Sequence, residues 1–91
     1  MCGIAGVLSF GDFPVTRQRL VKLSKSLEHR GPNGVGYATW SENTGLIVSS
    51  DIDSLEVGKV GLVHRRLSII DLSDAASQPF VSPDGKVVVV F

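Results

Sequence analysis

The chain has little of what marks metal-binding, secreted or membrane proteins: it has a single cysteine, one tryptophan and no net charge. One cysteine excludes an internal disulfide framework, and no cluster of cysteine and histidine has the spacing of a metal site. Nine basic and nine acidic side chains create no global field that would attract nucleic acid or an anionic membrane. No apolar run approaches the roughly 20 residues of a membrane helix, and no export signal follows Met1. We expect a cytoplasmic protein with no nucleic-acid or membrane partner.

A length of 91 residues, of which 43% are hydrophobic, allows at most one small domain with a modest core. Apolar side chains recur at near-helical intervals over residues 15–27 and predict one helix there. Thr16 is a suitable N-cap, Val15 and Leu20 can form a hydrophobic staple, and Gly31 can end the segment in the left-handed conformation. The basic side chains of this helix are interpreted as a solvated face rather than a nucleic-acid patch: Arg17, Arg19, Lys22 and Lys25.

A largely antiparallel sheet is expected beside this helix. Its strands are predicted from apolar or alternating segments at residues 3–10, 35–40, 46–50, 60–64 and 86–91. Residues 51–58 are polar enough for a surface loop, and Ser82-Pro83-Asp84-Gly85 has the composition of a tight turn. A helix packed on such a sheet is an α+β arrangement.

Cys2 is the strongest candidate for chemistry, because removal of Met1 would place it at the N-terminus. A thiol is nucleophilic only as the thiolate, and an α-amino group with a pKa of about 8 could take the thiol proton directly or through one water. Gly3 follows, and its backbone amide could support the negative charge that develops on a substrate carbonyl oxygen. The alternative reading of Cys2 is a small buried hydrophobe, and that of Gly3 an ordinary strand residue.

The opening Met-Cys-Gly-Ile-Ala-Gly resembles the start of class II glutamine amidotransferases, which are N-terminal-nucleophile hydrolases. The resemblance implies a four-layer αββα sandwich, with residues 1–91 forming the N-terminal part of its glutaminase domain. Residues 29–34, His-Arg-Gly-Pro-Asn-Gly, are similar to the family's His-Arg-Gly-Pro-Asp-Gly. Asn33 replaces the usual aspartate, which puts any electrostatic role of that aspartate in doubt. His29 is interpreted as a helix-end residue rather than a catalytic base.

Residues 61–71 resemble the glutamine-binding strand and loop of asparagine synthetases. A guanidinium can make two parallel hydrogen bonds to a carboxylate, so Arg66 suits the α-carboxylate of glutamine. By the same resemblance, the residues that would line the glutamine pocket are Leu67, Ser68, Ile69 and Ile70. A surface salt bridge is the alternative for either arginine, and Arg65 is interpreted as structural.

Gln78-Pro79-Phe80 and residues 86–91 resemble the family's Gln-Pro turn and the strand before an Asn-Gly-Glu loop. In the family, that loop supplies the oxyanion hole. We therefore expect a truncated glutaminase domain that is inactive by itself. The activity that the resemblance implies is glutamine hydrolysis through a Cys2 thioester, which supplies ammonia for ATP-dependent amide synthesis. The favoured product is asparagine made from aspartate.

The implied partners are L-glutamine and a synthetase domain outside this chain, and a homodimer of the full-length enzyme is left open. No cofactor is expected within the chain, whereas ATP and Mg²⁺ are expected in the synthetase domain. Two alternatives remain, namely a non-catalytic fragment or interaction module, and the glutaminase part of another amidotransferase. An Asn-Gly-Glu sequence directly after Phe91 would favour the enzyme.

Overall fold

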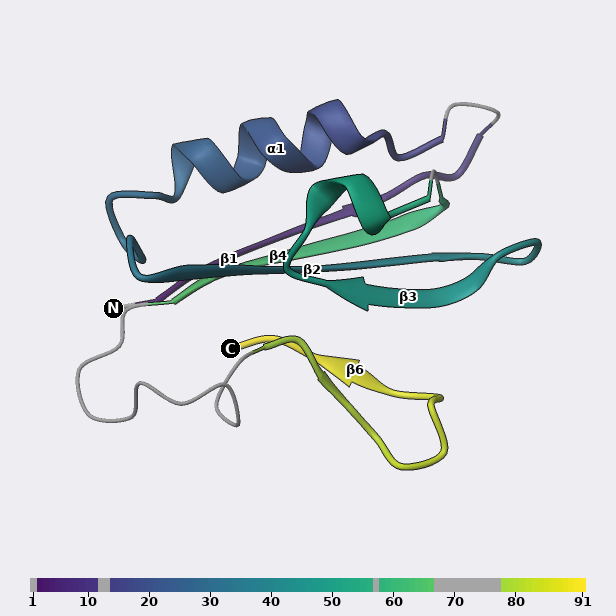
Figure 1. The fold of residues 1–91 in the computed structure, drawn as a ribbon. Helices are drawn as coiled ribbons and strands as arrows, with labels where there is room; N and C mark the ends of the chain where they lie inside the picture. Colours follow the sequence, from purple (N-terminus) through teal and green to yellow (C-terminus); the bar gives the residue numbers. More distant parts are fainter. Residues whose placement is uncertain (1, 12–13, 57, 67–77) are drawn as a thin grey trace.

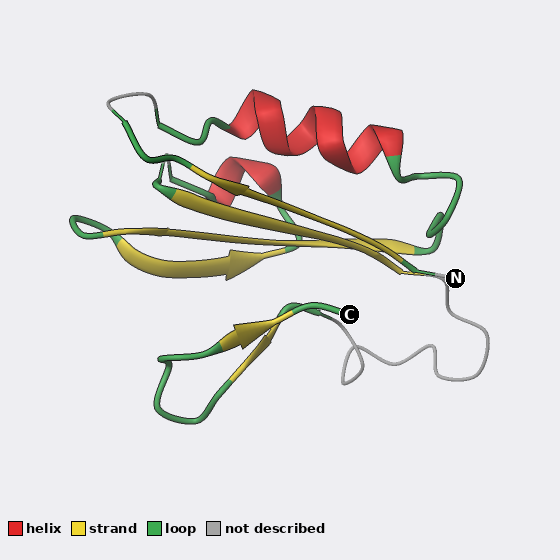
Figure 2. Ribbon diagram, turned by 180° about the vertical axis from the view of Figure 1, so that it is seen from behind, coloured by secondary structure: helices red, strands yellow, loops and turns green. Residues whose placement is uncertain are grey.

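A four-stranded antiparallel sheet with a helix on one face forms the frame of this computed structural model, which describes residues 2–11, 14–56, 58–66 and 78–91 (Figure 1). The strands lie in the order β1-β4-β2-β3, with bounds β1 Gly3–Leu8, β2 Gly34–Ser41, β3 Gly45–Ser49 and β4 Val60–Arg66. Two helices lie on one side of the sheet, α1 (Arg17–Ser26) and the short 3₁₀ helix η1 (Ile52–Ser54). A hairpin lies on the other side and consists of β5 (Phe80–Val81) and β6 (Val88–Val89) (Figure 2). The predicted α+β class is confirmed.

α1 begins as its sequence predicts. Thr16 is the N-cap, and its side-chain oxygen accepts a hydrogen bond from the backbone N–H of Arg19 at 3.3 Å. Val15 and Leu20, the two positions of the expected staple, are both buried in the core. The start of the helix is therefore set by neighbouring residues, as is typical of capped helices.

The end of α1 differs from the prediction. The helix ends at Ser26, and the chain continues through tight turns in which the Leu27 carbonyl accepts from the N–H groups of Arg30 (3.0 Å) and Gly31 (3.3 Å). Gly31 is not among the described glycines with positive φ, so the predicted left-handed cap is wrong. These turns satisfy the last helical carbonyls without a left-handed residue.

The hydrophobic core lies between α1 and the sheet. Leu20, Tyr37 and Val63 belong to it, and Leu55 is completely buried in the same cluster. The Nε of Arg17 donates to the carbonyl of Leu55, which ties the segment after η1 to the helix. The prediction of a polar surface loop over residues 51–58 is wrong at Leu55, which is buried. A single apolar residue in a short polar segment gives no repeating pattern from which its burial could be predicted.

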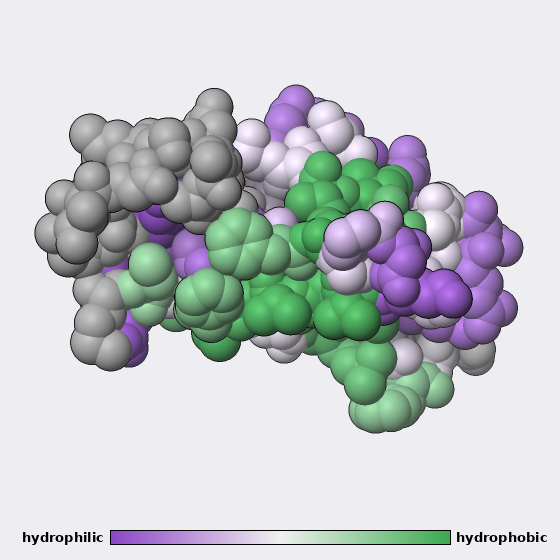
Figure 3. Space-filling model, turned by 90° about the horizontal axis from the view of Figure 1, so that it is seen from below, coloured by the Kyte–Doolittle hydropathy of each residue, from purple (hydrophilic) through white to green (hydrophobic). Residues whose placement is uncertain are grey.

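The opposite face of the sheet is apolar and partly open. Figure 3 shows hydrophobic side chains gathered on this side of the molecule. Four large hydrophobic residues from three strands are exposed here: Ile4 (50%), Leu8 (56%), Trp40 (42%) and Val48 (40%). Alternation along the strands explains this, because the odd-numbered positions of β1, β2 and β3 contribute to the core, so that the even-numbered positions point away from α1.

The β5–β6 hairpin covers another part of this face. A side chain at Gly36 would overlap the backbone carbonyl of Gln78, so the chain leading into β5 lies directly on β2. The predicted tight turn is confirmed, because the N–H of Gly85 donates to the Ser82 carbonyl at 2.9 Å and Gly85 has a φ of +74°. The strand expected over residues 86–91 is limited to Val88–Val89.

Candidate functional site

The candidate site lies where β1 begins and β4 ends. In the antiparallel register Gly3 pairs with Arg65, and Gly34 pairs with Arg66. One step further along the same register brings Cys2 opposite Arg66. Because side chains alternate between the two faces of a strand, Cys2 and Arg66 belong to the face that looks away from α1. The structure thus places the two residues that were singled out separately at neighbouring strand ends on one face, and both are half-buried.

Gly3 has a packing reason to be glycine. It is buried, and an added Cβ would lie 3.1 Å from the Cβ of Leu27 and 3.5 Å from the Cβ of Arg30. A larger side chain would therefore push the turn after α1 away from the sheet. This contact accounts for the residue type by itself, and the predicted contribution of the Gly3 amide to an oxyanion site stays a prediction.

The start of β2 lies beside the end of β4 and borders the site on that side. The backbone N–H of Asn33 donates to the carbonyl of Arg66 at 3.0 Å, and Gly34 continues this pairing. The substitution of aspartate by Asn33 leaves this backbone contact unaffected, since it uses no side-chain atom. The predicted pocket residues lie outside the described residues: Leu67, Ser68, Ile69 and Ile70.

His64 belongs to the same face as Arg66, and no sequence motif singled it out. It is 2% exposed, and its Nε2 has no hydrogen-bond partner among the described residues. Burial lowers the pKa of His64 below its ordinary value, and the nearby charge of Arg66 lowers it further, whereas a hydrogen bond with the backbone of Phe91 raises it. His64 is therefore a neutral imidazole near neutral pH. The alternation of Val60–Arg66 could have placed it beside Arg66. The other histidine, His29, is exposed in the turn after α1, as expected for a helix-end residue.

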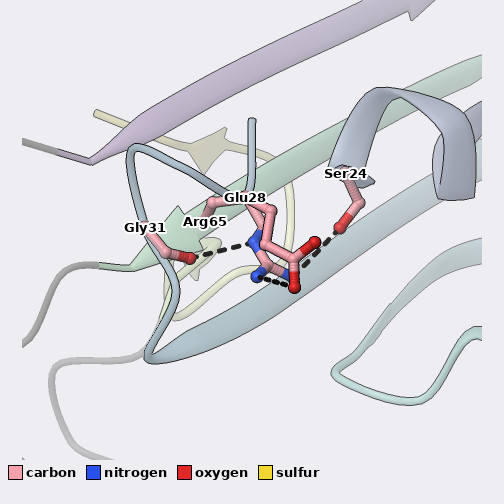
Figure 4. A network of polar contacts seen from close by, with 4 residues as sticks. All are labelled: Ser24, Glu28, Gly31 and Arg65. Atoms are coloured by element: carbon pink, nitrogen blue, oxygen red, sulfur yellow. Dashed lines mark hydrogen bonds and ion pairs between the residues drawn. The ribbon is translucent and has the colours of Figure 1, made fainter. Parts of the chain in front are cut away.

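Arg65 points to the other face of the sheet and has structural partners (Figure 4). Its Nε donates to the carbonyl of Gly31 at 2.9 Å, and its Nη1 donates to the hydroxyl of Ser24 at 3.3 Å. Its Nη2 lies 3.8 Å from a carboxylate oxygen of Glu28. These contacts give Arg65 partners in α1 and in the turn after it, and they separate it from Arg66, its neighbour in the chain.

Other features of the described residues lie away from this end of the sheet. A groove beside α1 and η1 is lined by Thr16, Arg17, Gln18, Val21, Lys22, Lys25, Ile52 and Asp53. Among the residues that the structure describes, no group of three or more His, Cys, Asp or Glu side chains could hold a metal ion. No helix in this part of the chain is long and apolar enough to cross a bilayer.

Comparisons with known proteins concern almost the whole chain. The family described as a glutamine amidotransferase domain matches residues 1–91. The chain is 36% identical over 90 residues to the glutamine-hydrolyzing asparagine synthetase 1 of Lotus japonicus, and 37% identical over 90 residues to that of Zea mays. It is 33% identical over 93 residues to asparagine synthetase 2 of Bacillus subtilis. These alignments cover 98%, 98% and 99% of the chain, which spans only 12%, 12% and 10% of the relatives' own lengths. No solved structure matches the chain.

Proposed function

The chain belongs to the class II glutamine amidotransferase family, and from this membership we propose that Cys2 is the nucleophile of a glutaminase site. In this proposal, the site releases ammonia from the side-chain amide of glutamine. Arg66 holds the α-carboxylate of the substrate. The pocket residues 67–70 and the Gly3 amide complete the chain's share of the site.

The placement of Cys2 and Arg66 carries this proposal. Residues opposite each other in an antiparallel pair have Cα atoms about 4.5–5.5 Å apart. Four bonds join the α-carboxylate carbon of glutamine to its amide carbon, and bond lengths near 1.5 Å give an extended span of about 5 Å. The long Arg66 side chain can adjust its reach on this face, so a substrate of about 5 Å can bind the guanidinium at one end and approach the Cys2 thiol with its amide.

The reaction divides into two steps. The α-amine of Cys2 takes the thiol proton, and the sulfur attacks the amide carbon to form a carbon–sulfur bond. The amide nitrogen receives the proton and leaves as ammonia, so that a γ-glutamyl thioester remains. Water then attacks the thioester, releases glutamate and returns a proton to the sulfur. Arg66 contributes orientation, since its planar fork fits a carboxylate through two hydrogen bonds.

The first step requires that Met1 is removed, because a retained Met1 would convert the α-amine of Cys2 into an amide with no basic character. We predict that intact-mass analysis of active protein shows the methionine missing. Full glutaminase activity in protein that uniformly keeps Met1 would contradict the assignment of the base.

The ammonia acceptor is proposed from the relatives. Their names describe asparagine synthetases, so we propose asparagine formation from aspartate, with ATP and Mg²⁺ bound in a synthetase domain outside these residues. The finer fold, an αββα sandwich, belongs to the same proposal. It is supported by the sheet itself, which has one face covered by α1 and an opposite face that is apolar and partly exposed.

Cys2→Ala in the full-length protein tests the function. We expect loss of glutamine-dependent synthesis with retention of synthesis from added ammonia, because Cys2 acts only in ammonia release. Both activities are measured on the same preparation. Retained glutaminase turnover would remove Cys2 from the mechanism, and equal loss of both activities would indicate a folding role.

A further inference from the structure

The turn that follows α1 lies directly behind the two strand ends that carry the candidate site. Residues 27–31 form this turn, here called the backing turn. A side chain at Gly3 would first contact side-chain atoms of Leu27 and Arg30. A side chain at Gly31 would overlap the backbone carbonyl of Arg65. The backing turn therefore rests on β1 and β4 on the face opposite Cys2 and Arg66.

The Arg65 side chain links this turn and the end of α1 to β4. The Arg65 guanidinium binds the Gly31 carbonyl at 2.9 Å and the Ser24 hydroxyl at 3.3 Å, and it lies 3.8 Å from the Glu28 carboxylate (Figure 4). The Arg65 side chain is only 12% exposed, whereas that of Glu28 is 64% exposed. An ion pair with an exposed partner at this distance contributes little. The two hydrogen bonds are therefore the principal contacts, and the end of α1 also favours a cation.

The hold of Arg65 reaches the site through the backbone. Beyond Gly31 the chain turns at Pro32 and Asn33, and the N–H of Asn33 donates to the carbonyl of Arg66 at 3.0 Å. Arg65 thus binds Gly31 at one end of the segment 31–33, and Asn33 at the other end binds Arg66. A shift of the backing turn would move the backbone of Arg66 on one side and that of Gly3, next to Cys2, on the other.

We propose that Arg65 is a positioning residue that sets the distance and orientation between Cys2 and the carboxylate-binding Arg66. This inference rests on the proposed glutaminase function, and it adds a role that neither the family membership nor the motif assigns to Arg65. Arg65 does not touch glutamine. It acts from behind the sheet by clamping the backing turn to the last two residues of β4.

The experiment uses the full-length protein with Arg65→Gln and Arg65→Lys, and with Arg19→Gln as the matched control. Arg19 is an exposed arginine of α1 and belongs to no part of the proposed site. Two measurements are made on each variant: the KM and kcat for glutamine hydrolysis, and the rate at which iodoacetamide alkylates Cys2 with and without glutamine. Alkylation without glutamine reports the thiol itself, whereas protection by glutamine reports substrate binding.

We expect Arg65→Gln to raise the KM for glutamine and the protecting glutamine concentration by about tenfold, because a displaced backing turn moves Arg66 out of register with Cys2, and small displacements of positioning groups have effects of this size or larger. The alkylation rate without glutamine should stay within about twofold of wild type, because the thiol and its base are intact. Arg65→Lys should lie between wild type and Arg65→Gln, since an ammonium keeps the charge but lacks the fork that spans both acceptors. Arg19→Gln should match wild type.

An unchanged KM and unchanged protection in Arg65→Gln would overturn the proposal. A parallel rise in alkylation without glutamine, together with a lower unfolding temperature, would also overturn it and show a merely structural role. If Arg65→Gln does not fold, Arg65→Lys and Ser24→Ala make the same test with one contact weakened at a time. Failure of the proposed function is a different result, because wild-type protein would then show neither glutaminase activity nor protection of Cys2 by glutamine.

Discussion

At the scale of single residues, two adjacent arginines of β4 have different surroundings because neighbouring strand positions lie on opposite faces of the sheet. Arg65 and Arg66 have the same side chain and the same immediate sequence surroundings, yet they belong to opposite faces of β4. Arg65 contacts the helix side, and Arg66 belongs to the face of Cys2 and of the buried His64. Their substitutions should therefore have different consequences for glutamine.

If Arg66 holds the substrate carboxylate as proposed, Arg66→Lys in the full-length protein should weaken glutamine use by roughly ten- to a hundredfold in kcat/KM, because lysine keeps the charge but lacks the planar fork for two parallel hydrogen bonds. Synthesis from added ammonia should persist. The same substitution at Arg65 should have a smaller effect, and Arg19→Lys none. Steady-state kinetics with both nitrogen sources make the comparison, and equal small effects at positions 65 and 66 would mean that the carboxylate anchor lies elsewhere.

His64 should make the folded state sensitive to acid. Its pKa is lowered in the folded protein, first by burial and then by the charge of Arg66, so the unfolded chain binds a proton at this residue more readily. The contribution of His64 to the free energy of unfolding is therefore complete above the pKa of about 6.5 that it has in the unfolded chain. It falls as the pH drops below that value, and the fall ends below the lower pKa that His64 has in the folded protein.

The unfolding temperature of wild type, His64→Gln and His29→Gln, measured at pH 7.5 and at pH 5.5, tests this prediction. Wild type and His29→Gln should lose more stability between the two pH values than His64→Gln, since His29 is exposed. The same pH dependence in all three proteins would show that His64 does not contribute.

At the scale of elements, the connection between α1 and β2 is determined by contact with β4 rather than by its own turn preferences. The sequence His-Arg-Gly-Pro suggests a helix that ends on a left-handed glycine. In the structure Gly31 has another reason to be glycine, since its α-carbon lies against the backbone of Arg65. Only a residue without a side chain allows this approach.

Gly31→Ala should therefore destabilise the protein by about 1–3 kcal/mol, the usual cost of forcing extra atoms into a packed site. The glutamine KM should rise as well, because the backing turn would be displaced. Gly11→Ala is the control, since a Cβ there meets no atom within 4 Å. Urea unfolding and glutaminase kinetics of both variants provide the measurements, and equal stability of the two would show that the close contact at Gly31 does not restrict the residue type.

At the scale of the whole molecule, the two faces of the sheet differ. α1 and η1 cover one face, and Val15, Leu20, Leu55 and Val63 are at most 1% exposed beneath them. The hairpin covers only part of the other face, and further apolar side chains are exposed in the hairpin at Val87 (55%) and after it at Phe91 (69%). Contiguous exposed apolar surface of this kind usually contacts other protein in a folded assembly.

Produced as these 91 residues, the chain should therefore bind the dye ANS and self-associate as its concentration rises, because association removes apolar surface from water. Light scattering after size exclusion measures the association. The double variant Ile4→Thr with Val48→Thr should reduce it, whereas Lys22→Gln on the outer side of α1 should not. A monomer at every concentration, with no dye binding, would contradict this prediction.

Much of the fold follows from short-range signals. Thr16 caps α1 because a cap involves atoms three residues apart, and alternation in β1 and β4 reveals their two faces because it depends only on neighbouring residues. The candidates Cys2 and Arg66 also came from the chain alone, from a position at the N-terminus and from a motif. The family resemblance is confirmed by the comparisons.

Only the tertiary structure decided which distant residues meet. The contacts of Arg65 with Gly31 and Ser24 join residues 34 and 41 positions apart, and the burial of Leu55 depends on α1, whose Arg17 lies 38 positions away. The register between β1 and β4, which sets Cys2 opposite Arg66, likewise joins the two ends of a long segment. Local preferences carry no information on such pairings, because they are selected by the packing of the whole core and by the satisfaction of buried polar groups.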